Sequence, residues 1–280
     1  FGKESAVTSQ THRLLALADF EEGNYDEAVA HILDWLDKLA PRMGVQCNLV
    51  RRHCGTARSI IRTTLSEDTD PRLSEGYFES AKNQLLPMRR YQGLFENHVG
   101  RRVNRRLAEA AIALGDDELA NDAVDKWFLL LRDFELSEPE RALGEDPGPT
   151  PEKMATAMTL RSICAMRGGD LSTATAMASQ ALGIGAMDPC DKARCNAVLG
   201  VCQAKSGKAA DGQQRVIEAF ESLRELGSAN PLALSAYQPF VCQCVIDAYL
   251  ANNQSEEAAQ WTQTLDTLQK KIKQRRLTEL

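Results

Sequence analysis

The stretch from residue 156 to residue 181 constrains the fold of this chain more than any other. Apolar residues recur in its first half at the spacing of one helix face, at Met158, Ile163 and Met166. Gly168-Gly169 then breaks the pattern, and Asp170 can cap a second helix. That helix carries a seam of small residues, Ala174, Ala178 and Ala181, which lets it lie close against a neighbour. The stretch therefore predicts a hairpin of two closely packed helices.

The second half of the chain repeats this outline. Three pairs combine a capping residue with proline at the first helical position: Thr150-Pro151, Asp188-Pro189 and Asn230-Pro231. Ser255 can cap the last helix in the same way. Each proline opens a helical pattern of suitable length, so we predict hairpins over about residues 151–183, 189–226 and 231–273.

The first half of the chain predicts further helices, whose ends are less clearly marked by capping residues and prolines. One helix pair is expected over about residues 5–39, a long helix over about 43–66, and another over about 71–86. Gly76 also fits a turn in a different register, which leaves two interpretations of that last segment. Gly115-Asp116 marks the turn of a later pair. The fold class we predict is all-α, with about six antiparallel hairpins.

Residues 137–150 interrupt the helical patterns. They hold three prolines, two glycines and several acids, a composition typical of a loop or linker. We therefore divide the chain into N-terminal hairpins at 1–136, this linker, and C-terminal hairpins at 151–280.

The hairpins resemble tetratricopeptide repeats, whose pattern places glycine before the second helix and alanine on its inner face. Gly23 to Ala28 (GNYDEA) is the closest local match, and Leu199-Gly200 before Lys205-Ser206-Gly207 resembles the first-helix motif. Matching the turn glycines puts repeat starts near residues 9, 101, 155, 193 and 239. The resemblance implies a superhelical stack whose concave groove is formed mainly by the first helix of each hairpin.

Composition narrows the classes of partner and compartment. The formal net charge of −6 disfavours general nucleic-acid binding, and only 6% of residues are aromatic and suited to base stacking. No apolar run approaches the roughly 18 residues of a membrane span. No secretory signal is visible, and because Phe1 opens the chain we expect a module of a larger protein. Eight cysteines without a C-x-x-C pair indicate structural thiols in the cytoplasm or another reducing compartment, with redox sensing left open.

Catalytic motifs are missing from the sequence. It contains no P-loop, no G-x-S-x-G, no H-E-x-x-H and no glycine-rich dinucleotide fingerprint. The four histidines are scattered: His12, His31, His53 and His98. We therefore expect no enzyme, no cofactor and no metal site, and we assign the histidines to surface or packing roles.

Arginine is concentrated between residues 89 and 106. Arg101/Arg105 and Arg102/Arg106 are spaced four apart and create one broad basic helix surface. One interpretation pairs them with acids on a neighbouring hairpin, and the other has them recognise carboxylate or phosphate, which suits the planar guanidinium.

The chaperone-binding tetratricopeptide proteins use a clamp of Lys, Asn and Arg residues for a terminal carboxylate. Arg102 and Arg106 resemble its third-repeat basic pair, and Arg13 could match its first Lys. Leu17 stands where an Asn is expected. That departure argues against a standard chaperone-tail clamp.

The family register also implies which side chains face the concave groove. It assigns six basic residues there: Arg13, Arg102, Arg105, Arg167, Arg194 and Lys205. Three acids share those positions, Glu21, Glu109 and Asp247, which gives a local balance of +3 against the chain's −6.

From the resemblance we expect a protein-protein interaction scaffold, and from this balance we expect its groove to bind a protein or peptide segment. That segment would be acidic, phosphorylated or C-terminal. The alternative interpretation is a regulatory or sensor domain that controls an attached effector. An enzyme or a nucleic-acid-binding helical repeat ranks below both, and the oligomeric state stays open.

Overall fold

The computed structural model shows helices joined by turns, and no strand within the residues it describes. The described residues are 6–22, 27–28, 30–35, 82, 85–86, 89, 97–132, 150–229 and 231–278. This part of the chain is therefore all-α, as predicted. The expected helix over residues 43–66, most of the one over 71–86 and the linker up to residue 149 lie outside it.

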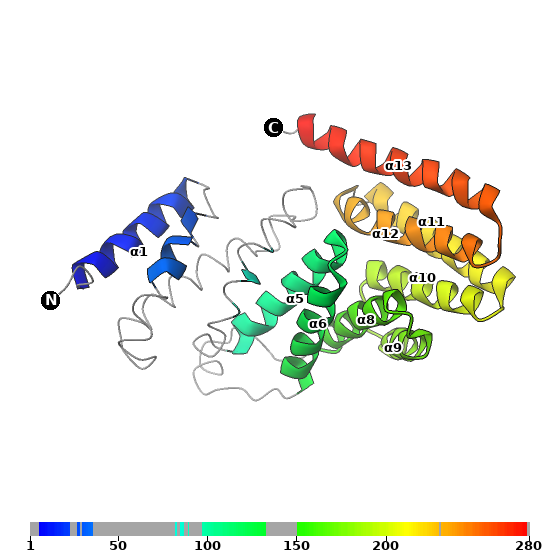
Figure 1. Cartoon of the computed structure of the whole chain (residues 1–280), viewed down its shortest axis with the longest axis horizontal. Coiled ribbons are helices and arrows are strands. Elements are labelled where there is room, and N and C mark those ends of the chain that lie inside the picture. The colour runs from blue at the N-terminus through cyan, green and yellow to red at the C-terminus, as the bar shows by residue number, and fades with distance from the viewer. Residues whose placement is uncertain are drawn as a thin grey trace. The chain divides into compact units, whose positions relative to one another are not determined.

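The chain divides into two compact units. Unit one comprises residues 1–71 and 79–107, and unit two comprises residues 72–78 and 108–280. Helix α5, Asn97–Leu114, contributes its first part to unit one and its last part to unit two. Figure 1 shows the helices in chain order from blue to red.

In unit one, α1 runs over Ala6–Glu21, and the described residues between 27 and 35 are helical. Histidine–aspartate contacts join the two segments: His31 Nε2 lies 3.2 Å from Asp19 Oδ2, and His12 Nδ1 lies 3.9 Å from Asp34 Oδ2. Apolar side chains buried in this unit include Ile32 and Trp35. The turn predicted at Gly23-Asn24 is outside the described residues.

Unit two begins with the end of α5 and with α6, Asp117–Arg132. Gly115 between them has a φ of +74°, a conformation that glycine adopts without strain. Asp116 Oδ1 accepts a hydrogen bond of 3.2 Å from the backbone N–H of Leu119, which caps the start of α6. The predicted turn at Gly115-Asp116 is confirmed.

Three sequential helix pairs make up the rest of unit two. The pairs are α8 (Pro151–Arg167) with α9 (Leu171–Gly183), α10 (Pro189–Lys205) with α11 (Ala209–Ala229), and α12 (Pro231–Leu250) with α13 (Ser255–Thr278). The first helix of each pair begins at the predicted proline. The second and third pairs extend three and five residues beyond their predicted ends, to Ala229 and Thr278.

Local capping explains why these helices start where they do. Thr150 Oγ1 accepts a 3.2 Å hydrogen bond from the backbone N–H of Lys153, and Asp188 Oδ1 accepts one of 2.7 Å from that of Cys190. Asp170 caps α9 as predicted, through a 2.9 Å bond from the backbone N–H of Thr173. Helix α13 begins at Ser255 itself, directly after Gln254.

The helices of unit two pack within pairs and between them. Each first helix contacts its own second helix, and α10 also contacts both α8 and α12. We call α8, α10 and α12 together the first-helix layer (Figure 1). The predicted alanine seam of α9 is confirmed, because Ala174, Ala178 and Ala181 have no exposed surface.

Two glycines let α10 and α11 cross at very short distance. A Cβ atom added at Gly200 would lie 2.6 Å from Cγ1 of Val216 and 2.7 Å from the carbonyl oxygen of Gly212. A Cβ atom added at Gly212 would meet the carbonyl oxygen of Gly200 even more closely. Neither position has room for a side chain, so the crossing depends on both glycines.

Candidate functional site

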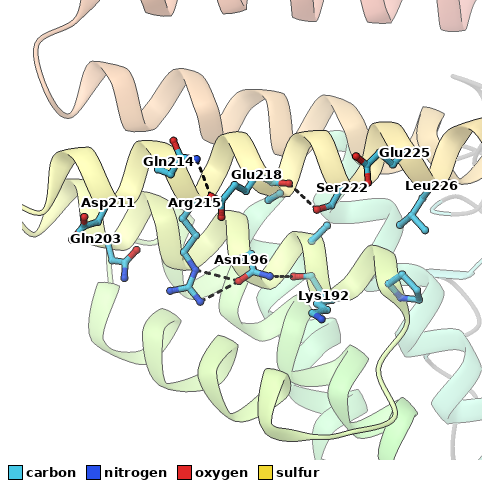
Figure 2. A pocket seen from close by; sticks show the side chains of 13 residues that line it. Lys192, Asn196, Gln203, Asp211, Gln214, Arg215, Glu218, Ser222, Glu225 and Leu226 are labelled. Atoms are coloured by element: carbon cyan, nitrogen blue, oxygen red, sulfur yellow. Dashed lines mark hydrogen bonds between the residues drawn. The ribbon is translucent and has the colours of Figure 1, made fainter.

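A groove of about 940 Å³ runs along α10 and α11 (Figure 2). Its lining comes from both helices: Pro189, Lys192, Ala193, Asn196 and Gln203 of α10, and Asp211, Gln214, Arg215, Glu218, Ala219, Ser222, Glu225 and Leu226 of α11. These residues recur every three, four or seven positions, which is the spacing of one face of each helix. We call this feature the α10/α11 groove.

Arg215 is the best-fixed cation of the groove. Its Nε and Nη2 groups donate hydrogen bonds of 3.2 and 3.1 Å to the same atom, Oδ1 of Asn196 on α10. Asn196 is itself anchored, because its Nδ2 donates a 3.0 Å bond to the backbone carbonyl of Lys192. Figure 2 shows the guanidinium reaching from α11 to this amide. Arg215 is therefore held in one orientation by a neutral partner.

The acidic side chains of the groove all belong to α11. They are Asp211, Glu218 and Glu225. Glu218 already accepts a 2.8 Å hydrogen bond from Nε2 of Gln214. On the α10 side, Lys192 is exposed, and Oε1 of Gln203 is buried without a hydrogen-bond partner. The α11 wall of the groove thus combines three acids with Arg215, and the α10 wall offers Lys192 with two amides.

A second polar cluster lies inside the first-helix layer. Arg194 and Asp191 of α10 are each 4% exposed and form an ion pair, and Oγ1 of Thr156 on α8 donates a 2.7 Å bond to Oδ2 of Asp191. The Arg194 guanidinium carbon lies 4.2 Å from the ring centroid of Tyr237 on α12. Burial disfavours the charged guanidinium, but the facing Asp191 outweighs this and raises the pKa of Arg194 above its usual value. The cluster joins three helices through one buried charge pair.

The six basic residues predicted for a concave groove fall in both units. Arg13 lies on α1 and Arg105 on α5, both in unit one, and the side chain of Arg102 is outside the described part of the chain. Arg167 donates from Nη1 to the carbonyl of Ile112 at 2.9 Å and to Oδ1 of Asp117 at 3.2 Å. Their role in partner binding stays a prediction.

Lys205 and Asp247, predicted for the same face, come together in unit two. With Leu250 and Ala251 they line a smaller pocket of about 430 Å³. Arg194, by contrast, is enclosed with Asp191. Arg167 and Arg194 are thus each paired with a carboxylate of the same chain, Asp117 and Asp191.

The cysteines of unit two are buried thiols. Six are free: Cys164, Cys190, Cys195, Cys202, Cys242 and Cys244. Burial raises the pKa of Cys164 to about 12 and that of Cys195 to about 11. Their thiolate forms, which are the reactive ones, are therefore disfavoured near neutral pH.

The described residues contain neither a metal-binding cluster nor a membrane-spanning helix. No group of three or more His, Cys, Asp or Glu side chains there is arranged to hold a metal ion. No helix in that part of the chain combines the length and apolarity needed to cross a bilayer.

Sequence reasoning missed the residues that shape the α10/α11 groove. Lys192 and Asn196 lie four apart on a helix whose other positions are mostly apolar, and that spacing was the available signal. The contact from Arg215 had no local signal, since it joins two helices at a separation of 19 residues. No known family model matches the chain, and no curated protein matches it in sequence.

Proposed function

We propose that this chain is a protein-interaction scaffold, a tetratricopeptide-like stack of helical hairpins that binds a segment of a partner protein. The observation that carries the proposal is the α10/α11 groove. Its volume of about 940 Å³ is at the upper end of the range for ligand sites, and two successive helices form it.

The dimensions of the groove suit an extended peptide. Because an α-helix rises about 1.5 Å per residue, the lining of α10 from Pro189 to Gln203 extends about 21 Å. An extended chain advances about 3.3 Å per residue, so about six residues of a partner would fit along it. A compact small molecule would leave much of that length unfilled.

The lining also suits a polypeptide. Amide side chains such as Asn196, Gln203 and Gln214 can donate to and accept from the main chain of a bound segment. Two packed helices hold these groups in place before binding, which reduces the ordering cost of association. The expected mechanism is therefore complementarity to a preformed groove.

The test is a selection from displayed random peptides of about twelve residues, roughly twice the length that spans the groove. The full chain is the bait, and Kd values of synthetic, labelled peptides are measured by fluorescence anisotropy. Ser222→Trp fills the groove at a side chain whose hydroxyl bonds only within its own helix, to the carbonyl of Glu218. Gln263→Trp on the exposed surface of α13 is the matched control.

We expect enriched peptides to bind the wild type and Gln263→Trp equally, and Ser222→Trp at least about 10-fold more weakly, a loss of about 1.4 kcal/mol. If no peptide is enriched over bait-free selection, the chain is not a peptide-binding scaffold. If the peptides bind Ser222→Trp as tightly as wild type, the groove is not their site.

A further inference from the structure

We propose that the α10/α11 groove selects a segment carrying an aspartate or glutamate side chain, whose carboxylate is bound by Arg215. The inference rests on the proposed function and names the chemistry of the partner. It is carried by the neutral anchoring of Arg215 in the groove lining.

The hydrogen bonds to Asn196 leave one edge of the Arg215 guanidinium, the one formed by Nη1 and Nη2, available to a carboxylate. A guanidinium has five N–H donors, and Asn196 takes one from Nε and one from Nη2. The edge formed by Nη1 and Nη2 keeps its donors, and its two parallel N–H bonds match the two oxygens of a carboxylate. Asn196 thus fixes the orientation of Arg215 without neutralising its charge.

The positive charge is also unpaired. Neither Arg215 nor Lys192 forms an ion pair with any carboxylate in the described part of the chain. Arg215 is partly buried, so a carboxylate that reaches it loses less of its binding energy to solvent screening than at a fully exposed cation. Lys192, one helical turn before Asn196 on α10, adds an exposed positive charge to the lining of the same groove.

The acids of the groove set a limit on how negative the ligand can be. Asp211, Glu218 and Glu225 outnumber the two cations, which leaves the lining with a net charge of −1. A phosphate group of about −1.5 to −2 at neutral pH would meet stronger repulsion than a carboxylate of −1. Between the acidic and the phosphorylated segments that the sequence left open, the groove favours the acidic one.

The experiment is a double-mutant cycle between the protein and a selected peptide. The probes are a labelled peptide from the selection above, its variant with the acidic residue changed to glutamine or asparagine, and its variant with phosphoserine there. Arg215→Gln removes the charge of the groove. Arg224→Gln is the matched control, because Arg224 is an exposed arginine of α11 outside the groove lining.

We expect wild type and Arg224→Gln to prefer the acidic peptide over its amide variant by about 10-fold or more, as charge-assisted bidentate bonds allow. The preference should disappear in Arg215→Gln, and the salt dependence of the Kd should become weaker. Asn196→Ala should reduce the preference while keeping the charge, because the guanidinium loses its fixed orientation.

Three results would overturn the inference. Selected peptides could lack an acidic residue, the acid preference could survive in Arg215→Gln, or the phosphoserine peptide could bind more tightly than the acidic one. In each case, loss of binding in Ser222→Trp would still support the proposed function. The two proposals can therefore fail separately.

Discussion

Replacing Gly200 by alanine tests how closely α10 and α11 must approach. The new methyl carbon would lie 2.6 Å from Cγ1 of Val216, about 1 Å inside the usual carbon contact distance of about 3.5–4.0 Å. It would also lie 2.7 Å from the carbonyl oxygen of Gly212, which is backbone and cannot rotate away. One helix must therefore move relative to the other.

The size of the effect follows from two opposed terms. Alanine is favoured over glycine inside a helix by about 1 kcal/mol, whereas overpacking a tight contact costs about 1–3 kcal/mol or more. Because a backbone atom is involved, we take the upper part of that range and expect a net loss of about 2 kcal/mol from Gly200→Ala. Helix propensity alone would instead predict that Gly200→Ala stabilises the protein by about 1 kcal/mol.

The assay is urea unfolding of the full chain, followed by far-ultraviolet circular dichroism. Gly183→Ala is the matched control: Gly183 is also helical, in α9, and a Cβ atom added there meets nothing within 4 Å. The control should unfold at the wild-type urea concentration or slightly above it, with an unchanged slope. If Gly200→Ala unfolds like the control, α10 and α11 do not approach each other as closely as described.

Three other substitutions test separate features by the same urea assay. Ala174→Leu should destabilise by about 1–3 kcal/mol, because Ala174 is fully buried in the α9 seam; an unchanged midpoint would contradict this packing. Thr150→Ala should cost about 1 kcal/mol by removing the cap of α8, and Thr150→Ser should restore it. Cys164, with its pKa raised to about 12 against 9.0 when unfolded, keeps its proton in the native state while the unfolded state loses it. The free energy of unfolding should therefore fall as pH rises above 9. Between pH 8 and 10 it should fall by about 1 kcal/mol less in Cys164→Ala than in wild type. An equal fall in both proteins would show that the Cys164 thiol is not buried.

Helix starts could be predicted from the sequence because a cap is local chemistry. Thr150 and Asp170 each accept a hydrogen bond from the backbone N–H three residues later, so both partners are visible in one short stretch. The ends of the helices were harder to predict from the sequence. Helix α11 continues past its predicted end at about residue 226 to Ala229, so that Gly227 lies inside the helix and does not end it.

The α10/α11 groove could not be predicted, because it depends on how two helices are rotated against each other. Helical spacing places Lys192 and Asn196 on one face of α10, but it does not say that this face meets Arg215. That meeting requires the close crossing at Gly200 and Gly212. The sequence marked Gly200 only through its resemblance to a repeat motif and did not mark Gly212, because the partner of each glycine lies on the other helix.

Arg194 and Arg215 show why the partner of an arginine matters more than its position in a repeat pattern. Both lie in the second helix pair of unit two, and both are held by a neighbouring polar side chain. Asp191 neutralises Arg194, and the buried pair contacts Thr156 of α8 and Tyr237 of α12, so that it joins three helices. An amide orients Arg215 and leaves the charge in place. The pattern placed Arg194 in the binding set because it records where first-helix side chains point and not what charge remains after they pair. It passed over Arg215 because α11 is the second helix of its pair. A chain with a net charge of −6 can thus still offer a carboxylate a fixed cation, provided that the cation is anchored by a neutral group.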